Sequence, residues 1–171
     1  MINIALFEPQ IPQNTGNIAR LAVGLDIPLM LVGKLGFSLQ DRYLKRAGLD
    51  YWEFLKLEVY QNLKNFQENT ENKRKIFVTT KGLIPYFDFQ FKKNDILLFG
   101  SETTGLPVDL LKENLQNTIT IPMPGNVRSL NLSNSAAIVA YFALHQVGYF
   151  DGFKVNRNFS DLGVNDGEFE F

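Results

Sequence analysis

The chain has 171 residues, of which 45% are hydrophobic and 15 are phenylalanine, enough apolar side chains for the core of one domain. The formal net charge is −1, cysteine is absent and there is one histidine, which excludes disulfides and metal sites built from cysteine or histidine clusters. No apolar run approaches the roughly 18 residues of a membrane span, and the N-terminus lacks the basic start of a signal peptide. We therefore expect a cytoplasmic protein without a metal or a membrane contact.

Short apolar runs alternate along the chain with helical patterns. Strands are expected over residues 2–7, 28–32, 76–80, 96–99 and 118–121. Helices are expected over residues 15–25, 40–47, 61–69, 108–113 and 134–147. This alternation predicts an α/β fold with a mainly parallel sheet flanked by helices.

Three of these strands lead into polar loops. The first loop holds Asn14, Gly16 and Asn17, and the second runs from Gly100 to Pro107. The third spans residues 121–134, carries an arginine, two serines and three asparagines, and precedes a helix that Ser133 or Asn134 is expected to cap. In parallel sheets, ligands bind beyond the carboxyl ends of strands. Each loop alone is equally consistent with a solvated turn, but together they indicate a ligand site.

The last helix is apolar on every side from Ala136 to Leu144, with Ala136, Ala140 and Ala143 forming a stripe of small residues. A helix of this kind is buried on more than one side. Two explanations are open: contact with a second subunit, or a central core position in a monomer.

Charge is unevenly distributed along the chain. Residues 151–171 hold five acids and two bases, whereas residues 1–150 hold 13 acids and 15 bases. Local positive charge matters more than the total for phosphate binding. We expect a domain over residues 1–150 followed by an acidic tail over residues 151–171.

The three loops also carry ordered motifs: N-T-G-N-x-x-R over residues 14–20, G-x-E-x-x-G-L-P over residues 100–107, and I-P-M followed by R-S-L-N-L-S-N over residues 121–134. Together they resemble the SPOUT class of knotted RNA methyltransferases, in particular the tRNA 2′-O-methyltransferases that act on the wobble nucleotide. The similarity spans residues 1 to about 149. It implies a C-terminal trefoil knot, a homodimer, S-adenosylmethionine as cofactor, and methyl transfer to the ribose 2′-oxygen of cytidine or a modified uridine at tRNA position 34, in the anticodon stem-loop.

The resemblance implies a cofactor site formed by Val78, Gly100, Ile121 and Ser129, with neighbouring contacts from Met123 and Leu130. Gly100 would allow close backbone approach by the ligand, while Val78 and Ile121 would flank an adenine. Without the resemblance, Val78 and Ile121 also fit ordinary core positions at strand ends.

Arg20 is the expected catalytic residue, because the resemblance places it beside the target nucleotide. A guanidinium there would stabilise the developing alkoxide rather than act as a general base. Asn14 and Asn17 would organise the start of the first helix, and Glu102 would accept hydrogen bonds from backbone amides or from Arg20.

Two arginines are expected to contact RNA, Arg128 and Arg46. For Arg128, a structural ion pair is nearly as good an explanation. Asn131 and Asn134 are expected to fix the third loop. Thr104 departs from the family pattern, since related sequences often carry a basic residue there, and we therefore expect one RNA contact of the family to be missing.

Three other functions fit parts of the sequence. The same chemistry on another tRNA position or on ribosomal RNA is the nearest, and a catalytically silent RNA-binding homologue is the second. A nucleotide- or NAD-binding protein is the third, but the chain contains neither G-x-G-x-x-G nor G-x-x-x-x-G-K-[ST].

Overall fold

The computed structural model describes residues 1–39 and 52–153. The expected helix over residues 40–47, Arg46 and the greater part of the acidic tail lie outside these ranges. Within them, no helix is both long and apolar enough to cross a membrane.

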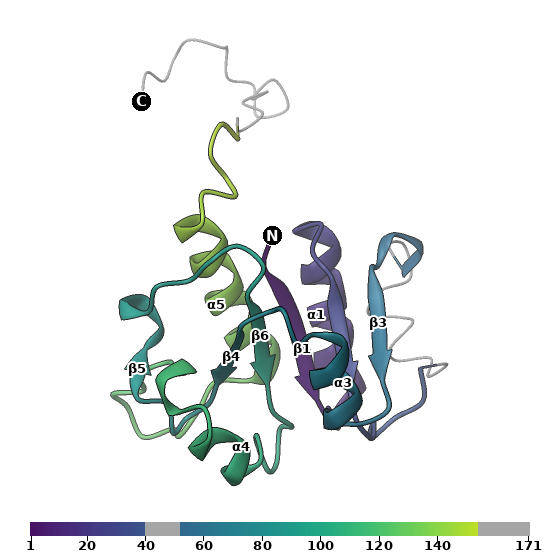
Figure 1. Cartoon of the computed structure of the whole chain (residues 1–171), viewed down its shortest axis with the longest axis horizontal. Helices are drawn as coiled ribbons and strands as arrows, with labels where there is room; N and C mark the ends of the chain where they lie inside the picture. The colour runs from purple at the N-terminus through teal and green to yellow at the C-terminus, as the bar shows by residue number, and fades with distance from the viewer. Residues whose placement is uncertain (40–51, 154–171) are drawn as a thin grey trace.

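A seven-stranded sheet forms the centre of the described chain (Figure 1). Its strand order is β3-β2-β1-β6-β4-β7-β5, and every neighbouring pair is parallel. The strands are β1 (Asn3–Phe7), β2 (Leu29–Val32), β3 (Leu57–Tyr60), β4 (Lys75–Val78), β5 (Ile84–Pro85), β6 (Ile96–Phe99) and β7 (Thr118–Thr120). The prediction of a parallel α/β sheet is therefore confirmed.

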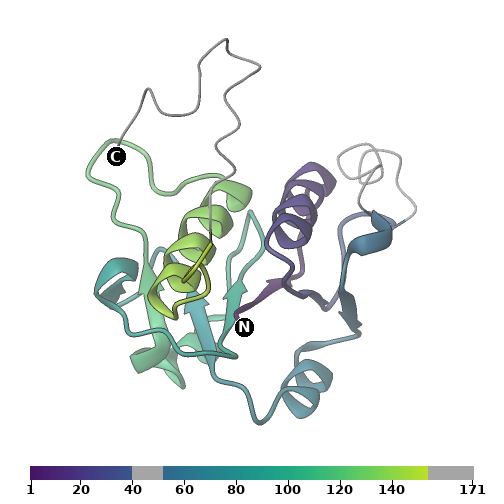
Figure 2. The ribbon, with the colours of Figure 1, turned by 90° about the horizontal axis from the view of Figure 1, so that it is seen from above.

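Helices cover both faces of this sheet. The long helices α1 (Pro12–Gly24) and α5 (Leu132–Gln146) pack against each other on one face. Figure 2 shows them side by side, with α3 (Leu63–Asn69) on the opposite side. The short α4 (Val108–Lys112) contributes Leu110 and Leu111 to the same apolar cluster as Phe66 of α3. Single turns of 3₁₀ helix lie at Trp52–Phe54, Tyr86–Asp88 and Leu115–Asn117.

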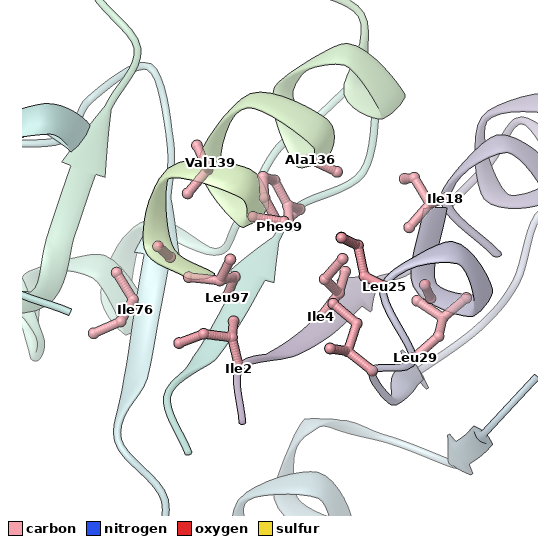
Figure 3. Close-up of a cluster of buried hydrophobic side chains, with 14 of the residues drawn as sticks. Ile2, Ile4, Ile18, Leu25, Leu29, Ile76, Leu97, Phe99, Ala136 and Val139 are labelled. Atoms are coloured by element: carbon pink, nitrogen blue, oxygen red, sulfur yellow. The ribbon is translucent and has the colours of Figure 1, made fainter. Parts of the chain in front are cut away.

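The strands divide their side chains between two cores because successive residues point to opposite faces. In β6, Leu97 and Phe99 face α1 and α5, while Ile96 and Leu98 join the cluster under α3 and α4. Figure 3 shows Phe99 beneath Ala136 and Val139 of α5. The interior strands are thus apolar on both faces, as expected for a covered parallel sheet.

Several element boundaries differ from the prediction. The chain pattern did not reveal β3, a half-exposed edge strand, or β5, which has two residues. Helix α1 begins at Pro12 rather than at residue 15, since proline is well suited to the first helical turn. The expected cap at Ser133 or Asn134 is wrong: Asn131 caps α5, and its side chain accepts the Ser133 N–H. The knot implied by the resemblance stays a prediction.

Candidate active site

A cleft of about 420 Å³ lies at the carboxyl ends of β4, β6 and β7. Its walls come from the loops that follow these strands and from the first turn of α1 and of α5. All three motif-bearing loops contribute, through Asn14, Glu102 and Ser129. The expectation that these loops meet at one edge of the sheet is confirmed.

Glu102 holds the start of α1 in place. Its Oε2 accepts the Gln10 N–H at 2.8 Å, and its Oε1 accepts the Ile11 N–H at 3.2 Å and the Asn14 Nδ2 at 2.9 Å. Ile11, the N-cap residue of α1, has no side-chain cap of its own. A carboxylate at this end of the helix also interacts favourably with the helix dipole. Glu102 therefore binds backbone amides as expected.

Asn14 links Glu102 to the third loop. The Asn131 Nδ2 donates to the Asn14 Oδ1 at 2.9 Å, while the Asn131 Oδ1 accepts the Ser133 N–H at 2.9 Å and its hydroxyl at 2.7 Å. Asn14 is buried despite its polar side chain. One hydrogen-bonded chain thus fixes the two helix starts and the β6 loop relative to one another.

The loop after β6 is closed by its own backbone. The Gly105 N–H donates to the Ser101 carbonyl at 3.0 Å, and the Ser101 and Thr104 hydroxyls lie 2.7 Å apart. A Cβ on Gly100 would lie 2.2 Å from the Gly105 carbonyl carbon and 2.3 Å from the Leu106 nitrogen. The space beside Gly100 is therefore filled by the protein's own loop. The structure thus gives its own reason for a glycine there, and close approach by a ligand stays a prediction.

Five of the six expected cofactor residues line the cleft, namely Val78, Gly100, Ile121, Ser129 and Leu130. Met123 does not, because the chain leaves the cleft wall after Ile121 and returns to it at Arg128. Arg128 is exposed on this returning segment. Its position agrees with a role at the mouth of the cleft, and the roles of all these residues stay predictions.

Arg20 and Asn17 are exposed on α1 and are not among the residues lining the cleft. Arg20 is six positions beyond Asn14, which corresponds to about 9 Å along a helix axis. Since α1 runs back from the carboxyl edge of the sheet, Arg20 lies further from the cleft than Asn14 does. The sequence spacing gives this distance along the helix, but not the direction in which α1 runs relative to the cleft.

Sequence reasoning assigned no site role to the turn after β4, although Thr79, Thr80 and Lys81 all line the cleft. Asn131 was expected to fix the third loop, and in the structure its side chain also donates a hydrogen bond to Asn14 of α1. Threonines after a strand carry no distinctive pattern, but a lysine in a four-residue turn at the carboxyl edge of the sheet was a usable signal.

The cleft suits an organic ligand with both apolar and polar parts. Val78, Ile121 and Leu130 supply apolar surface, and hydroxyls of the threonines and serines supply hydrogen-bonding groups. Its volume is in the range typical of small-molecule sites. Within residues 1–39 and 52–153, no group of three or more His, Asp or Glu side chains could hold a metal ion.

The fold and cleft define a parallel α/β protein with a ligand site at the carboxyl edge, as in methyltransferases of the SPOUT type. Residues 1–141 match the SpoU rRNA Methylase family, and the chain belongs to that family. It is 47% identical over 150 residues to a "Putative tRNA (cytidine(34)-2'-O)-methyltransferase" of Listeria monocytogenes serotype 4b (strain F2365), covering 86% of this chain and 89% of the relative.

Solved structures agree. A structure concerning the 2-OH methylation of C/U34 on tRNA is 41% identical, has a TM-score of 0.82, and covers 85% of this chain and 95% of its own. The SpoU methyltransferase AviRb from Streptomyces viridochromogenes, in complex with the cofactor AdoMet, is 26% identical with a TM-score of 0.75. That match covers 84% of this chain and 57% of AviRb. The resemblance inferred from the three motifs is confirmed.

Proposed function

We propose that this protein transfers a methyl group from S-adenosylmethionine to the ribose 2′-oxygen of the wobble nucleotide, cytidine or a modified uridine at position 34, of tRNA. The observation that carries the proposal is the meeting of all three motif-bearing loops at one cleft. The names of the Listeria relative and of the C/U34 structure point to the same substrate. The family match over residues 1–141 lies within the proposed catalytic domain, residues 1–150.

The cleft residues fit the cofactor. Apolar side chains at Val78, Ile121 and Leu130 suit the faces of an adenine, while Ser129 and the backbone of the loops offer polar partners. When bound, S-adenosylmethionine supplies an electrophilic methyl on a sulfonium, from which a neutral thioether is a good leaving group, so the transfer needs neither a metal nor a covalent intermediate. The protein's tasks are then alignment and charge stabilisation.

Glu102, Asn14 and Asn131 are positioning residues in this proposal. Their hydrogen bonds hold the start of α1 against the loop after β6 and against the third loop. Arg20 is the proposed catalytic residue, since the positive charge of a guanidinium stabilises the alkoxide that develops on the 2′-oxygen. Arg128 and Arg46 are proposed to contact RNA phosphates.

The proposed assembly is a homodimer formed through α5. Ala136, Ala140 and Ala143 are fully buried against the protein's own core, so the small-residue stripe is already covered. On the same helix, Ile138 and Tyr141 remain 37% and 52% exposed. An apolar helix with an exposed second face favours the subunit-contact explanation over the monomer core. Light scattering at micromolar concentration should give the mass of a dimer, and a monomer mass would contradict this.

Methylation of ribosomal RNA is a second candidate, favoured by the description of the matching family. The decisive experiment transfers labelled methyl from S-adenosylmethionine to tRNA lacking wobble 2′-O-methylation, with ribosomal RNA in parallel and nucleoside mapping of the products. Label on the tRNA wobble ribose is the expected result. Label on ribosomal RNA alone would overturn the substrate, and cofactor binding without any transfer would leave a silent RNA-binding homologue.

A further inference from the structure

The turn that follows β4 is fastened to the neighbouring strand β7 at both ends. The Thr79 N–H donates to the Ile119 carbonyl at 2.9 Å, and the Leu83 N–H donates to the Thr118 Oγ1 at 3.2 Å. Inside the turn, the Gly82 N–H donates to the Thr79 carbonyl at 3.1 Å, and the Lys81 N–H donates to the Thr79 Oγ1 at 3.3 Å. Hydrogen bonds within the turn and to β7 therefore hold the backbone on either side of Lys81 in place.

Gly82 shows how closely this turn is pressed on the sheet. A Cβ at Gly82 would lie 2.2 Å from the Ile119 carbonyl carbon and 2.6 Å from the Thr120 nitrogen, and neither backbone atom has room to move. Only glycine fits there. The turn consequently presents the exposed Lys81 at the cleft from a rigid base.

The charge of Lys81 is not neutralised by the part of the protein that the structure describes. Lys56, Lys64 and Lys112 each have a carboxylate partner on the surface, whereas Lys81 forms no ion pair within residues 1–39 and 52–153. The one carboxylate among the cleft-lining residues, Glu102, already accepts three hydrogen bonds from the start of α1. A cation held rigidly at a cleft without a counter-charge attracts anionic ligands.

We propose that Lys81 binds a phosphate of the RNA strand that enters the cleft and so sets the register of the target ribose; this rests on the proposed function. Two anions could meet Lys81: an RNA phosphate or the carboxylate of the cofactor's methionyl part. The exposure of Lys81 and its neighbour Thr80 favours the RNA, whose phosphates remain at the surface, whereas the proposed adenine site lies against the apolar side chains of the cleft. Phosphate contacts of this kind position a nucleic acid without reading its sequence.

The test compares Lys81→Ala and Lys81→Arg with the unchanged protein in the methyl-transfer assay, measuring KM for tRNA, KM for S-adenosylmethionine and kcat. Lys64→Ala, which removes the same charge from α3, is the matched control. We expect Lys81→Ala to raise KM for tRNA roughly tenfold and to lower the salt slope of RNA binding by about 1. KM for the cofactor should stay unchanged, Lys81→Arg should retain most of the affinity, and Lys64→Ala should behave as the unchanged protein.

An equal KM for tRNA in Lys81→Ala would overturn the inference, and so would a rise confined to KM for the cofactor, which would assign Lys81 to the methionyl carboxylate. Direct binding of an anticodon stem-loop RNA, followed by fluorescence anisotropy, separates this inference from the proposed function. If the unchanged protein transfers no methyl but loses RNA affinity on Lys81→Ala, only the proposed function fails. If it binds no RNA at all, both fail.

Discussion

Asn131 donates a hydrogen bond to Asn14 at 2.9 Å, although the two residues are 117 positions apart in the chain. The contact joins the N-cap of α5 to the first turn of α1. Because Asn14 also donates to Glu102 at 2.9 Å, both amide groups are held in one orientation. The geometry of the site thus depends on a polar network that joins segments far apart in the sequence at one cleft.

Replacing Asn131 tests that network. Asn131→Ala removes the α5 cap and the link to Asn14, and we expect it to lower the free energy of unfolding by about 2 kcal/mol. Asn131→Asp keeps a good cap acceptor but sets a carboxylate against the Asn14 Oδ1, so it should lose transfer activity out of proportion to stability. Urea unfolding and kcat on tRNA measure the two effects. If Asn131→Asp has the same stability and kcat as the unchanged protein, the hydrogen bond from Asn131 to Asn14 does not support the site.

Glu102→Gln should loosen the start of α1. Three N–H donors converge on the carboxylate, and a glutamine would turn its own NH₂ toward at least one of them. Leaving such a group unsatisfied costs about 1–3 kcal/mol. Unfolding in urea should show this loss, whereas Glu113→Gln, an exposed change at the end of α4, should shift stability by less than about 0.5 kcal/mol. Identical curves for the two variants would contradict the assigned role.

The interior strands could be predicted from the sequence because they are apolar on both faces and long enough to form distinct runs, as in β1 and β6. The edge strands β3 and β5 could not be predicted in this way. β5 pairs with β7 through Ile84 and Pro85 alone, and two residues form no pattern. Likewise, residues 131–134 offer several good capping side chains, and only the path of the chain selects Asn131.

The site was predictable in outline, through motifs at strand ends, but not in its contacts. Glu102 meets Asn14 across 88 positions, and no local spacing encodes that pairing. Gly100 was correctly placed at the cleft, but the sequence did not show that the backbone of Gly105 and Leu106 leaves no room for a side chain there. Residue types indicated which loops line the cleft, and packing determined how each residue is held there.

Arg74 and Asp95, which precede β4 and β6, form a partly buried ion pair at the edge of the sheet opposite the cleft. The Arg74 guanidinium donates to both Asp95 oxygens, at 2.9 and 2.6 Å, and the Asp95 side chain is 2% exposed. Asp95→Asn should cost about 3 kcal/mol of stability without changing cofactor affinity, as measured by unfolding and calorimetry. Asp109→Asn, which breaks a surface pair with Lys112, should cost less than about 1 kcal/mol. Weakened cofactor binding by the folded Asp95→Asn protein would show that the two edges are coupled.

Tyr60 should make stability depend on alkaline pH. Burial, together with the hydrogen bond to Glu58 and its charge, raises the pKa of Tyr60 to about 12. The folded state therefore keeps this proton at pH values where the unfolded state has lost it, since an ordinary tyrosine pKa is about 10. Its contribution to stability is complete below pH of about 10 and is lost as the pH rises toward about 12. Urea unfolding measured between pH of about 10 and about 12 should show that the free energy of unfolding falls less steeply with pH in Tyr60→Phe than in the unchanged protein. An equal slope in the two proteins would show that Tyr60 is not the group responsible.

The position of Arg20 predicts that catalysis occurs between subunits. Arg20 is exposed on α1 and does not line the cleft of its own chain, whereas a dimer formed through α5 would offer it the cleft of the partner. Arg20→Ala should therefore bind cofactor normally and transfer no methyl. In Ser129→Trp, the indole introduced at an exposed loop position should fill the cleft and prevent cofactor binding. Circular dichroism should show that this variant keeps its fold.

Mixing these two inactive variants, after brief dissociation and reassociation, distinguishes the arrangements. If Arg20 acts at the cleft of the partner subunit, each mixed dimer has one cleft that binds cofactor and one intact Arg20 that reaches it. About half of the dimers are mixed, and each has one working site out of two. About a quarter of the unchanged protein's activity should therefore return. If Arg20 serves its own cleft, no mixed dimer is active. Cofactor binding lost in Arg20→Ala alone would instead assign the arginine to the cofactor.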